Sequence, residues 1–214
     1  IGNDAVIGYD LRNEPLHYPG QCTWGDGNPA TDIRAMYQRV GNAIQDLDTD
    51  KLIIAEGPQN WKHSFQGIGP APEGDLTAVK DKPVSLRFAN KVVYSVHLYA
   101  NFKPMDGAAA ISRMNRVWGY LVTNNIAPVW VGETGASLDP RSSDFQQEKA
   151  FYQTLVAYLN GQDGDQHGPT FRPGQQAIGT TWWAWGHLAG QSPNGTLERD
   201  WATPRQEQRT IYRQ

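Results

Sequence analysis

The sequence has a single cysteine, Cys22, among its 214 residues. One cysteine excludes an internal disulfide, and the lack of any Cys-x-x-Cys spacing argues against a structural zinc site. Basic residues form no cluster: 19 Lys and Arg stand against 22 Asp and Glu, for a net charge of −3. No apolar run is long enough to span a bilayer. We therefore expect neither a nucleic-acid partner nor a membrane partner.

Aromatic residues, by contrast, are abundant, with eight Trp and nine Tyr in the chain. They could fill a core or provide flat platforms for sugar rings, and composition alone leaves both readings open. The hydrophobic content of 39% is enough for one domain with a sizeable core.

Short apolar runs alternate with longer amphipathic stretches along the chain. The runs lie at 5–11, 51–56, 92–99, 127–133 and 177–185. Nearly continuous apolar strands of this kind are typical of a parallel sheet that is covered on both faces. The segments 57–90 and 160–176 read as loops, and the tail 205–214 as a last helix.

Three amphipathic helices are expected between the strands, each with a candidate cap at its start. They are 33–47, capped by Thr31 or Asp32; 110–121, opened by Asp106; and a helix through 151–159, opened by a capping box of Ser143 and Gln146. Their apolar stripes are Ile33, Met36, Tyr37, Val40, Ala43, Ile44 and Leu47; Ala110, Ile111, Met114, Val117, Trp118 and Leu121; and Phe151, Leu155, Val156 and Leu159.

Five strands in βα order fit two α/β architectures. A complete (β/α)8 barrel needs eight strands and about 250 residues, so this chain has the content of the last five strands of such a barrel. An open doubly wound sheet is the alternative, but it usually carries a Gly-rich turn after its first strand. Here that turn reads RNEPLHYPG instead.

Polar residues recur where the expected strands end. They are Asn13 and Glu14, then Glu56, then His97 and Tyr99, then Glu133, and finally Trp182, Trp183 and Trp185. The carboxyl ends of parallel barrel strands share one rim, and active sites lie there. Two carboxyl groups within aromatic walls suit glycosidic bond cleavage, in which one donates a proton and the other attacks the anomeric carbon or activates water.

These residues also carry a family resemblance. The segments DLRNEP, YSVHLY, VWGYLVTNNIAPVWVGE and TTWWAWG closely resemble glycoside hydrolase family 5, in particular its bacterial endo-β-1,4-glucanases, or cellulases. The likeness runs along essentially the whole chain in the order of the family. It implies a (β/α)8 TIM barrel of which this chain supplies the fourth to eighth strands. Residues 1–214 would then be the C-terminal part of a single catalytic domain.

The resemblance also implies roles for individual residues in a retaining double displacement. Glu14 would be the general acid/base and Glu133 the catalytic nucleophile. Asn13 would bind the sugar hydroxyl next to the reacting carbon, and His97 and Tyr99 would shape the site around the nucleophile. The substrate platforms are Trp183 under the reacting sugar and, in loops at the rim, Trp61 and Trp24, each of which could equally pack within its loop.

The resemblance implies no metal or organic cofactor, and a β-glucan or cello-oligosaccharide as substrate. It implies a secreted enzyme, although the printed sequence does not open on a basic and apolar leader. Because strands one to three of the family are not matched, we expect an N-terminal fragment of the same barrel as a second chain, or a paired copy. Cys22 is either inert or paired with a cysteine in that second chain.

Other readings remain open at this point. Mannan, xyloglucan or mixed-linkage glucan could replace cellulose on the same fold. The chain could also be a non-catalytic carbohydrate-binding fragment. A metal-dependent barrel hydrolase would need clustered His and Asp at strand ends, where only His97 qualifies. Glu56 reads as structural or as lying at the edge of the site.

Overall fold

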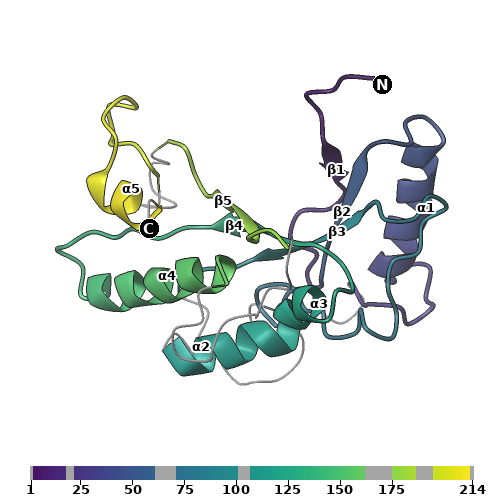
Figure 1. Cartoon of the computed structure of the whole chain (residues 1–214), viewed down its shortest axis with the longest axis horizontal. Helices are drawn as coiled ribbons and strands as arrows, with labels where there is room; N and C mark the ends of the chain where they lie inside the picture. Colours follow the sequence, from purple (N-terminus) through teal and green to yellow (C-terminus); the bar gives the residue numbers. More distant parts are fainter. Residues whose placement is uncertain are drawn as a thin grey trace. The chain divides into compact units, whose positions relative to one another are not determined.

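The computed structural model describes residues 2–17, 22–60, 71–100, 107–161, 175–186 and 195–212 (Figure 1). These residues form two compact units. Unit 1 comprises Ile1–Val96 and Val117–Trp130, and unit 2 comprises His97–Arg116 and Val131–Gln214.

Strands and helices alternate along most of the chain, as labelled in Figure 1. The strands are β1 (Gly8–Asp10), β2 (Leu52–Glu56), β3 (Val92–His97), β4 (Val129–Thr134) and β5 (Gly179–Trp182). The helices are α1 (Ile33–Gln45), α2 (Gly107–Met114), the π-helical η2 (Asn115–Gly119), α3 (Tyr120–Thr123), α4 (Phe145–Leu159) and α5 (Gln206–Tyr212). Among the described helices, none is long and apolar enough to cross a bilayer.

The strands follow one another in the sheet in chain order, β1-β2-β3-β4-β5. β1 pairs with β2 in parallel, with Gly8 opposite Leu52, and β2 pairs with β3 in parallel, with Ile53 opposite Val92. A doubly wound sheet reverses its strand order at a switch point. An unreversed order is instead what successive βα units of a barrel produce.

Helix α1 shows how the sequence positions a helix of unit 1. Asp32 is its N-cap, because the carboxylate accepts the Ala35 backbone N–H at 3.1 Å, which decides between the two predicted caps. The helix buries Ile33, Tyr37 and Gly41. Leu47 lies beyond the end of α1 and is 68% exposed, so its predicted place in the apolar stripe is wrong.

The second predicted helix is present but not as a single α-helix. Its α-helical turns widen into η2 and resume in α3. Met114, Trp118 and Leu121 of the predicted stripe are all fully buried. Asp106, its predicted cap, lies outside the described residues.

The cap predicted for helix α4 differs from the one in the structure. Asp144 is at the N-cap position and makes no capping hydrogen bond with its side chain, while the Ser143 hydroxyl donates to the Asp144 carboxylate at 3.3 Å. The predicted capping box of Ser143 and Gln146 is therefore not formed. The inner face of the helix consists of Phe151, Tyr152, Leu155, Tyr158 and Leu159, whereas Val156, predicted for this face, is only half-buried.

The expected loop 57–90 and the expected C-terminal helix agree with the described residues, whereas β1 and β5 are not covered on both faces as expected. The segments 57–60 and 71–90 contain no helix and no extended strand, and α5 occupies the predicted C-terminal helix. Most of the predicted loop 160–176 lies outside the described residues.

Candidate active site

Every strand carries a predicted site residue at or just beyond its carboxyl end. Asn13 and Glu14 follow β1, Glu56 ends β2, His97 ends β3 with Tyr99 two residues later, Glu133 lies in β4, and Trp183 follows β5 directly. This is the end of parallel strands at which barrel enzymes place their chemistry.

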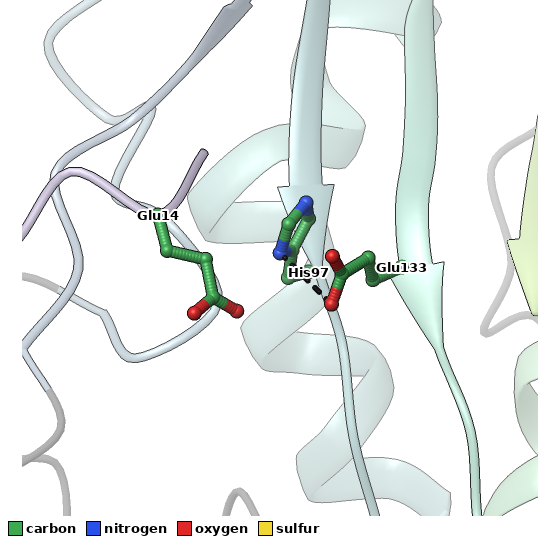
Figure 2. Close-up of side chains that lie close together, drawn as sticks. All are labelled: Glu14, His97 and Glu133. Atoms are coloured by element: carbon green, nitrogen blue, oxygen red, sulfur yellow. Dashed lines mark ion pairs between the residues drawn. The ribbon is translucent and has the colours of Figure 1, made fainter. Parts of the chain in front are cut away.

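In unit 2, two side chains hold one oxygen of the Glu133 carboxylate. The Tyr99 hydroxyl donates to Oε2 at 2.7 Å. His97 Nδ1 lies 3.4 Å from the same oxygen, as the dashed line in Figure 2 marks. His97 is buried, with 2% of its side chain exposed, while 19% of the Glu133 side chain is exposed. The backbone is also fixed, because the Leu98 N–H donates to the Glu133 carbonyl at 2.8 Å. Unit 2 therefore presents an oriented and partly accessible carboxylate.

The residues that follow Glu133 are anchored by α4. The Thr134 hydroxyl donates to the Leu98 carbonyl at 2.6 Å, and the Gly135 N–H donates to the Tyr152 hydroxyl at 2.8 Å. The Tyr152 ring also packs against Trp182, with centroids 5.3 Å apart. Tyr152 was not predicted as a site residue, because its only signal in the sequence is a hydroxyl on the buried face of a helix.

The tryptophans at the end of β5 differ in their surroundings: one ring is packed and the other is accessible. Trp182 packs on Tyr152 within unit 2. Trp183 is 45% exposed, and its backbone N–H donates to the Thr134 carbonyl at 2.7 Å. The alternation of side chains along a strand sends neighbouring rings to opposite faces. Trp183 is thus a fixed but accessible aromatic surface of unit 2, and its role as a sugar platform stays a prediction.

In unit 1, Glu14 sits in a backbone conformation that few residues adopt. Its φ is 44°, in the left-handed region, and its side chain is half-buried. Its N–H donates to Glu56 Oε2 at 2.8 Å. Asn13, immediately before it, is exposed. Figure 2 also labels Glu14.

Glu56 is a fully buried carboxylate at the end of β2, with 0% exposure. Besides the Glu14 N–H, it accepts the Gln59 side-chain N–H on Oε1 at 2.5 Å. The Tyr37 hydroxyl donates to its backbone carbonyl at 2.8 Å. The structure therefore places Glu56 as support for the segment that carries Glu14.

The two remaining predicted platforms have different outcomes. Trp24 is half-buried in unit 1, its ring centroid lies 6.1 Å from that of Tyr37, and its indole N–H donates to the Lys82 carbonyl at 2.9 Å. These contacts favour packing over sugar stacking for Trp24. Trp61 lies outside the described residues.

The Cys22 thiol and the candidate metal ligands are described within each unit separately. The Cys22 thiol is unpaired in the structure, and burial raises its pKa. Among the described residues, neither unit taken by itself gathers three His, Cys, Asp or Glu ligand atoms close enough for a metal ion. Independence from metal stays a prediction.

Comparison with known proteins identifies relatives along the whole chain. The family model described as Cellulase (glycosyl hydrolase family 5) matches residues 2–188. An endoglucanase of Paenibacillus polymyxa is 35% identical over 212 residues, which cover 94% of this chain and 47% of that protein. The major extracellular endoglucanase of Xanthomonas campestris pv. campestris is 24% identical over 222 residues, which cover 97% of this chain and 40% of that protein.

Solved structures agree with the sequence matches. An endocellulase from Pyrococcus horikoshii in complex with cellotetraose superimposes with a TM-score of 0.74 at 27% identity, over 96% of this chain and 56% of that chain. The chain thus spans about half the length of the relatives it matches. Its unreversed strand order and these neighbours fit part of a (β/α)8 barrel. On the extent of the family match and the identity to the Paenibacillus enzyme, the chain belongs to glycosyl hydrolase family 5, the cellulase family.

Proposed function

We propose that this chain forms the C-terminal part of the catalytic domain of a retaining endo-β-1,4-glucanase and supplies the fourth to eighth strands of its barrel. The observation that carries the proposal is the Glu133 carboxylate at the end of β4, held by Tyr99 and His97, in a chain of the cellulase family. Cellotetraose bound to the Pyrococcus relative supports a β-1,4-glucan as substrate.

In the proposed mechanism, Glu133 attacks the anomeric carbon while the protonated Glu14 donates its proton to the leaving oxygen. A glycosyl–Glu133 ester forms, and the glucosidic bond breaks. Glu14, now ionised, takes a proton from water as the water oxygen attacks the anomeric carbon; the bond to Glu133 breaks, the Glu133 carboxylate leaves, and the sugar is released with its configuration retained. Retention requires the two carboxyl groups to lie about 5–5.5 Å apart during the reaction.

The other predicted residues would bind and orient the sugar. Asn13 would hold the hydroxyl beside the reacting carbon, and the Trp183 indole would lie under the ring of the reacting sugar. His97 and Tyr99 would keep the Glu133 oxygen aimed at the anomeric carbon, in line with their contacts to Oε2. Trp61, and Trp24 if its packing allows, would bind sugars farther along the chain.

Two substitutions in the native enzyme, with any chain that completes the barrel present, test these roles. Glu133→Gln should abolish hydrolysis of soluble β-1,4-glucan and of aryl cellobiosides, because no nucleophile remains. Glu14→Gln should lose glucan hydrolysis but retain the first step on 2,4-dinitrophenyl cellobioside, whose leaving group needs no proton. Glu198→Gln, at an exposed carboxylate, is the matched control and should leave both rates unchanged. Wild-type rates in both site variants would contradict the assignment.

A mechanism-based inhibitor gives a direct identification of the nucleophile. A 2-deoxy-2-fluoro cellobioside with a good leaving group should form a stable ester, and peptide mass mapping should find it on Glu133. Binding of cellotetraose without any hydrolysis would favour the non-catalytic carbohydrate-binding alternative. Loss of activity with a chelator would instead favour the metal-dependent alternative.

We also propose that a further segment of the barrel, contributed by a second chain, completes the fold, and that the enzyme is extracellular. β1 is at one end of the strand order, and Tyr9 within it is 37% exposed, although barrel strands are covered on both faces. An extracellular location is supported by the relative from Xanthomonas campestris, a major extracellular endoglucanase. A native mass of 23.8 kDa for a stable, active monomer would contradict the need for a second chain.

A further inference from the structure

We propose that Glu56 is a positioning residue that sets the place of Glu14 through the Glu14 backbone. This inference rests on the proposed role of Glu14 as general acid/base. The contact that carries it is the 2.8 Å hydrogen bond from the Glu14 N–H to Glu56 Oε2, between residues 42 positions apart in the chain.

The Glu14 backbone needs such a contact because its conformation is unfavourable. A non-glycine residue with φ of 44° lies in the left-handed region, where its Cβ crowds the following carbonyl oxygen. A backbone hydrogen bond to a buried carboxyl group opposes rotation out of this conformation, because the rotation would leave that group without its partner. The bond to Glu56 therefore holds the strained backbone in place and fixes the direction in which the Glu14 side chain leaves it.

Gln59 contacts both the Glu56 carboxyl group and the segment that follows Glu14. Its side-chain N–H donates to Glu56 Oε1 at 2.5 Å, and its backbone N–H donates to the Pro15 carbonyl at 2.7 Å. The His17 N–H in turn donates to the Gln59 carbonyl at 2.7 Å. Glu56 thus holds Glu14 directly and also holds Gln59, which pairs with Pro15 and His17 just after Glu14.

The far side of Glu56 is closed by backbone. A Cβ on Gly57 would lie 2.5 Å from the Asp75 carbonyl oxygen, and one on Gly74 would lie 3.5 Å from Glu56 Cγ. Segment 73–75 therefore packs directly over the end of β2. The Tyr37 hydroxyl fixes the Glu56 carbonyl as well. A carboxyl group enclosed in this way cannot move toward solvent. Its place relative to β2 is therefore fixed, and with it the place of the Glu14 N–H that it accepts.

The test compares leaving groups in the full-length native protein. Displacing a general acid costs rate only where the leaving group needs a proton, and a displacement of about 1 Å costs up to about 100-fold. Glu56→Ala should lower kcat/KM for cello-oligosaccharides by about 10- to 100-fold. It should change the first step on 2,4-dinitrophenyl cellobioside by less than about threefold. In a Glu14→Ala background, Glu56→Ala should cost nothing more on either substrate.

Conservative variants separate positioning from simple stability. Glu56→Gln keeps an oxygen for the Glu14 N–H, and a flipped Gln59 amide can accept from the new amide, so near wild-type activity is expected. Glu56→Asp retracts the carboxylate by one methylene and should reproduce the leaving-group-dependent loss to a smaller degree. Asp32→Ala is the matched control, because Asp32 is also a buried acceptor of backbone N–H groups in unit 1, but it accepts from Gly25, Gly27 and Ala35.

Amide hydrogen exchange provides a readout that does not need activity. The Glu14 N–H should exchange slowly in the wild type and at least about tenfold faster in Glu56→Ala, but not in Asp32→Ala. Equal losses on both substrate classes, or an unchanged exchange rate, would overturn the positioning role. A wild type without hydrolysis but with faster Glu14 exchange in Glu56→Ala would refute the proposed function and leave the structural support intact.

Discussion

Glu133 depends on the Tyr99 hydroxyl more directly than on any other side chain described in unit 2. That hydroxyl donates to Oε2 at 2.7 Å, while His97 lies farther away, at 3.4 Å. The sequence placed all three residues at strand ends, and only the structure shows that both neighbours converge on the same oxygen. These two contacts orient the Glu133 carboxylate at the end of its strand.

Tyr99→Phe should therefore lower kcat by about 10- to 100-fold, because Glu133, the proposed nucleophile, loses the donor that orients it and stabilises its charge. The melting temperature should change little, since Tyr99 is only half-buried. Steady-state kinetics on a soluble β-1,4-glucan measure the effect, with Tyr9→Phe as the exposed control. Unchanged kcat in Tyr99→Phe would show that His97 suffices.

Tyr152→Phe tests the support of the residues that follow Glu133, the proposed nucleophile. The loss of its hydroxyl leaves the buried Gly135 N–H without the acceptor it has at 2.8 Å, which costs about 1–3 kcal/mol of unfolding free energy. Urea denaturation followed by fluorescence should detect the change. Tyr158→Phe is the control on the same helix, because its hydroxyl donates to Asn115 at 2.7 Å, away from β4. Only Tyr152→Phe is expected to lower kcat as well.

At the scale of elements, the helix caps show how far the local sequence predicts hydrogen bonds. The sequence offered two caps for α1, and the structure selects Asp32, whose carboxylate also accepts the Gly25 and Gly27 N–H groups. The capping box predicted for α4 satisfied its sequence rule and is not formed. A capping motif states which bonds are available, but the path of the preceding loop decides whether the side chain reaches the helix.

Asp32→Ala should destabilise unit 1 by about 1–2 kcal/mol, because three backbone N–H groups lose their acceptor. Thr31→Ala removes the rival cap, whose hydroxyl donates to Asp26 instead, and should cost clearly less. Chemical denaturation of the two variants compares them directly. Equal losses would mean that the loop, rather than the cap, determines the stability of this end of α1.

At the scale of the whole molecule, buried tyrosines predict sensitivity to alkali. Burial raises the pKa of Tyr120 to about 12 and also raises the pKa of Tyr37, Tyr94 and Tyr158. The unfolded chain ionises these hydroxyls near the ordinary tyrosine pKa of about 10, so the unfolded state loses protons first. Their contribution to stability is full below pH 10 and falls as pH rises above it.

Melting temperatures measured by circular dichroism between pH 8 and pH 11 should therefore decline above about pH 10. Absorbance at 295 nm should show these tyrosines titrating later in the folded protein than in denaturant. Coincident titration in both states would contradict the assignment of buried, hydrogen-bonded hydroxyls.

The βα order, the positions of the strands and the site-bearing strand ends followed from the sequence, because apolar periodicity and turn residues are local properties. Loss of the α-helical pattern at η2 did not follow, since the stripe of Met114, Trp118 and Leu121 is compatible with either helix type. The role of Trp24 did not follow from the sequence either, because a tryptophan suits both packing on Tyr37 and stacking on a sugar.

By itself the sequence determined the chemical groups available to this protein, their order along the strands and the family to which the chain belongs. Only the tertiary structure decided which groups touch: Glu56 with the backbone of Glu14, Tyr99 and His97 with one oxygen of Glu133, and Tyr152 with Gly135. The physical reason is the distance along the chain over which each feature is determined. Apolar periodicity is set by residues a few positions apart. A hydrogen bond between residues 42 positions apart depends instead on strand register and loop path, which no local pattern encodes.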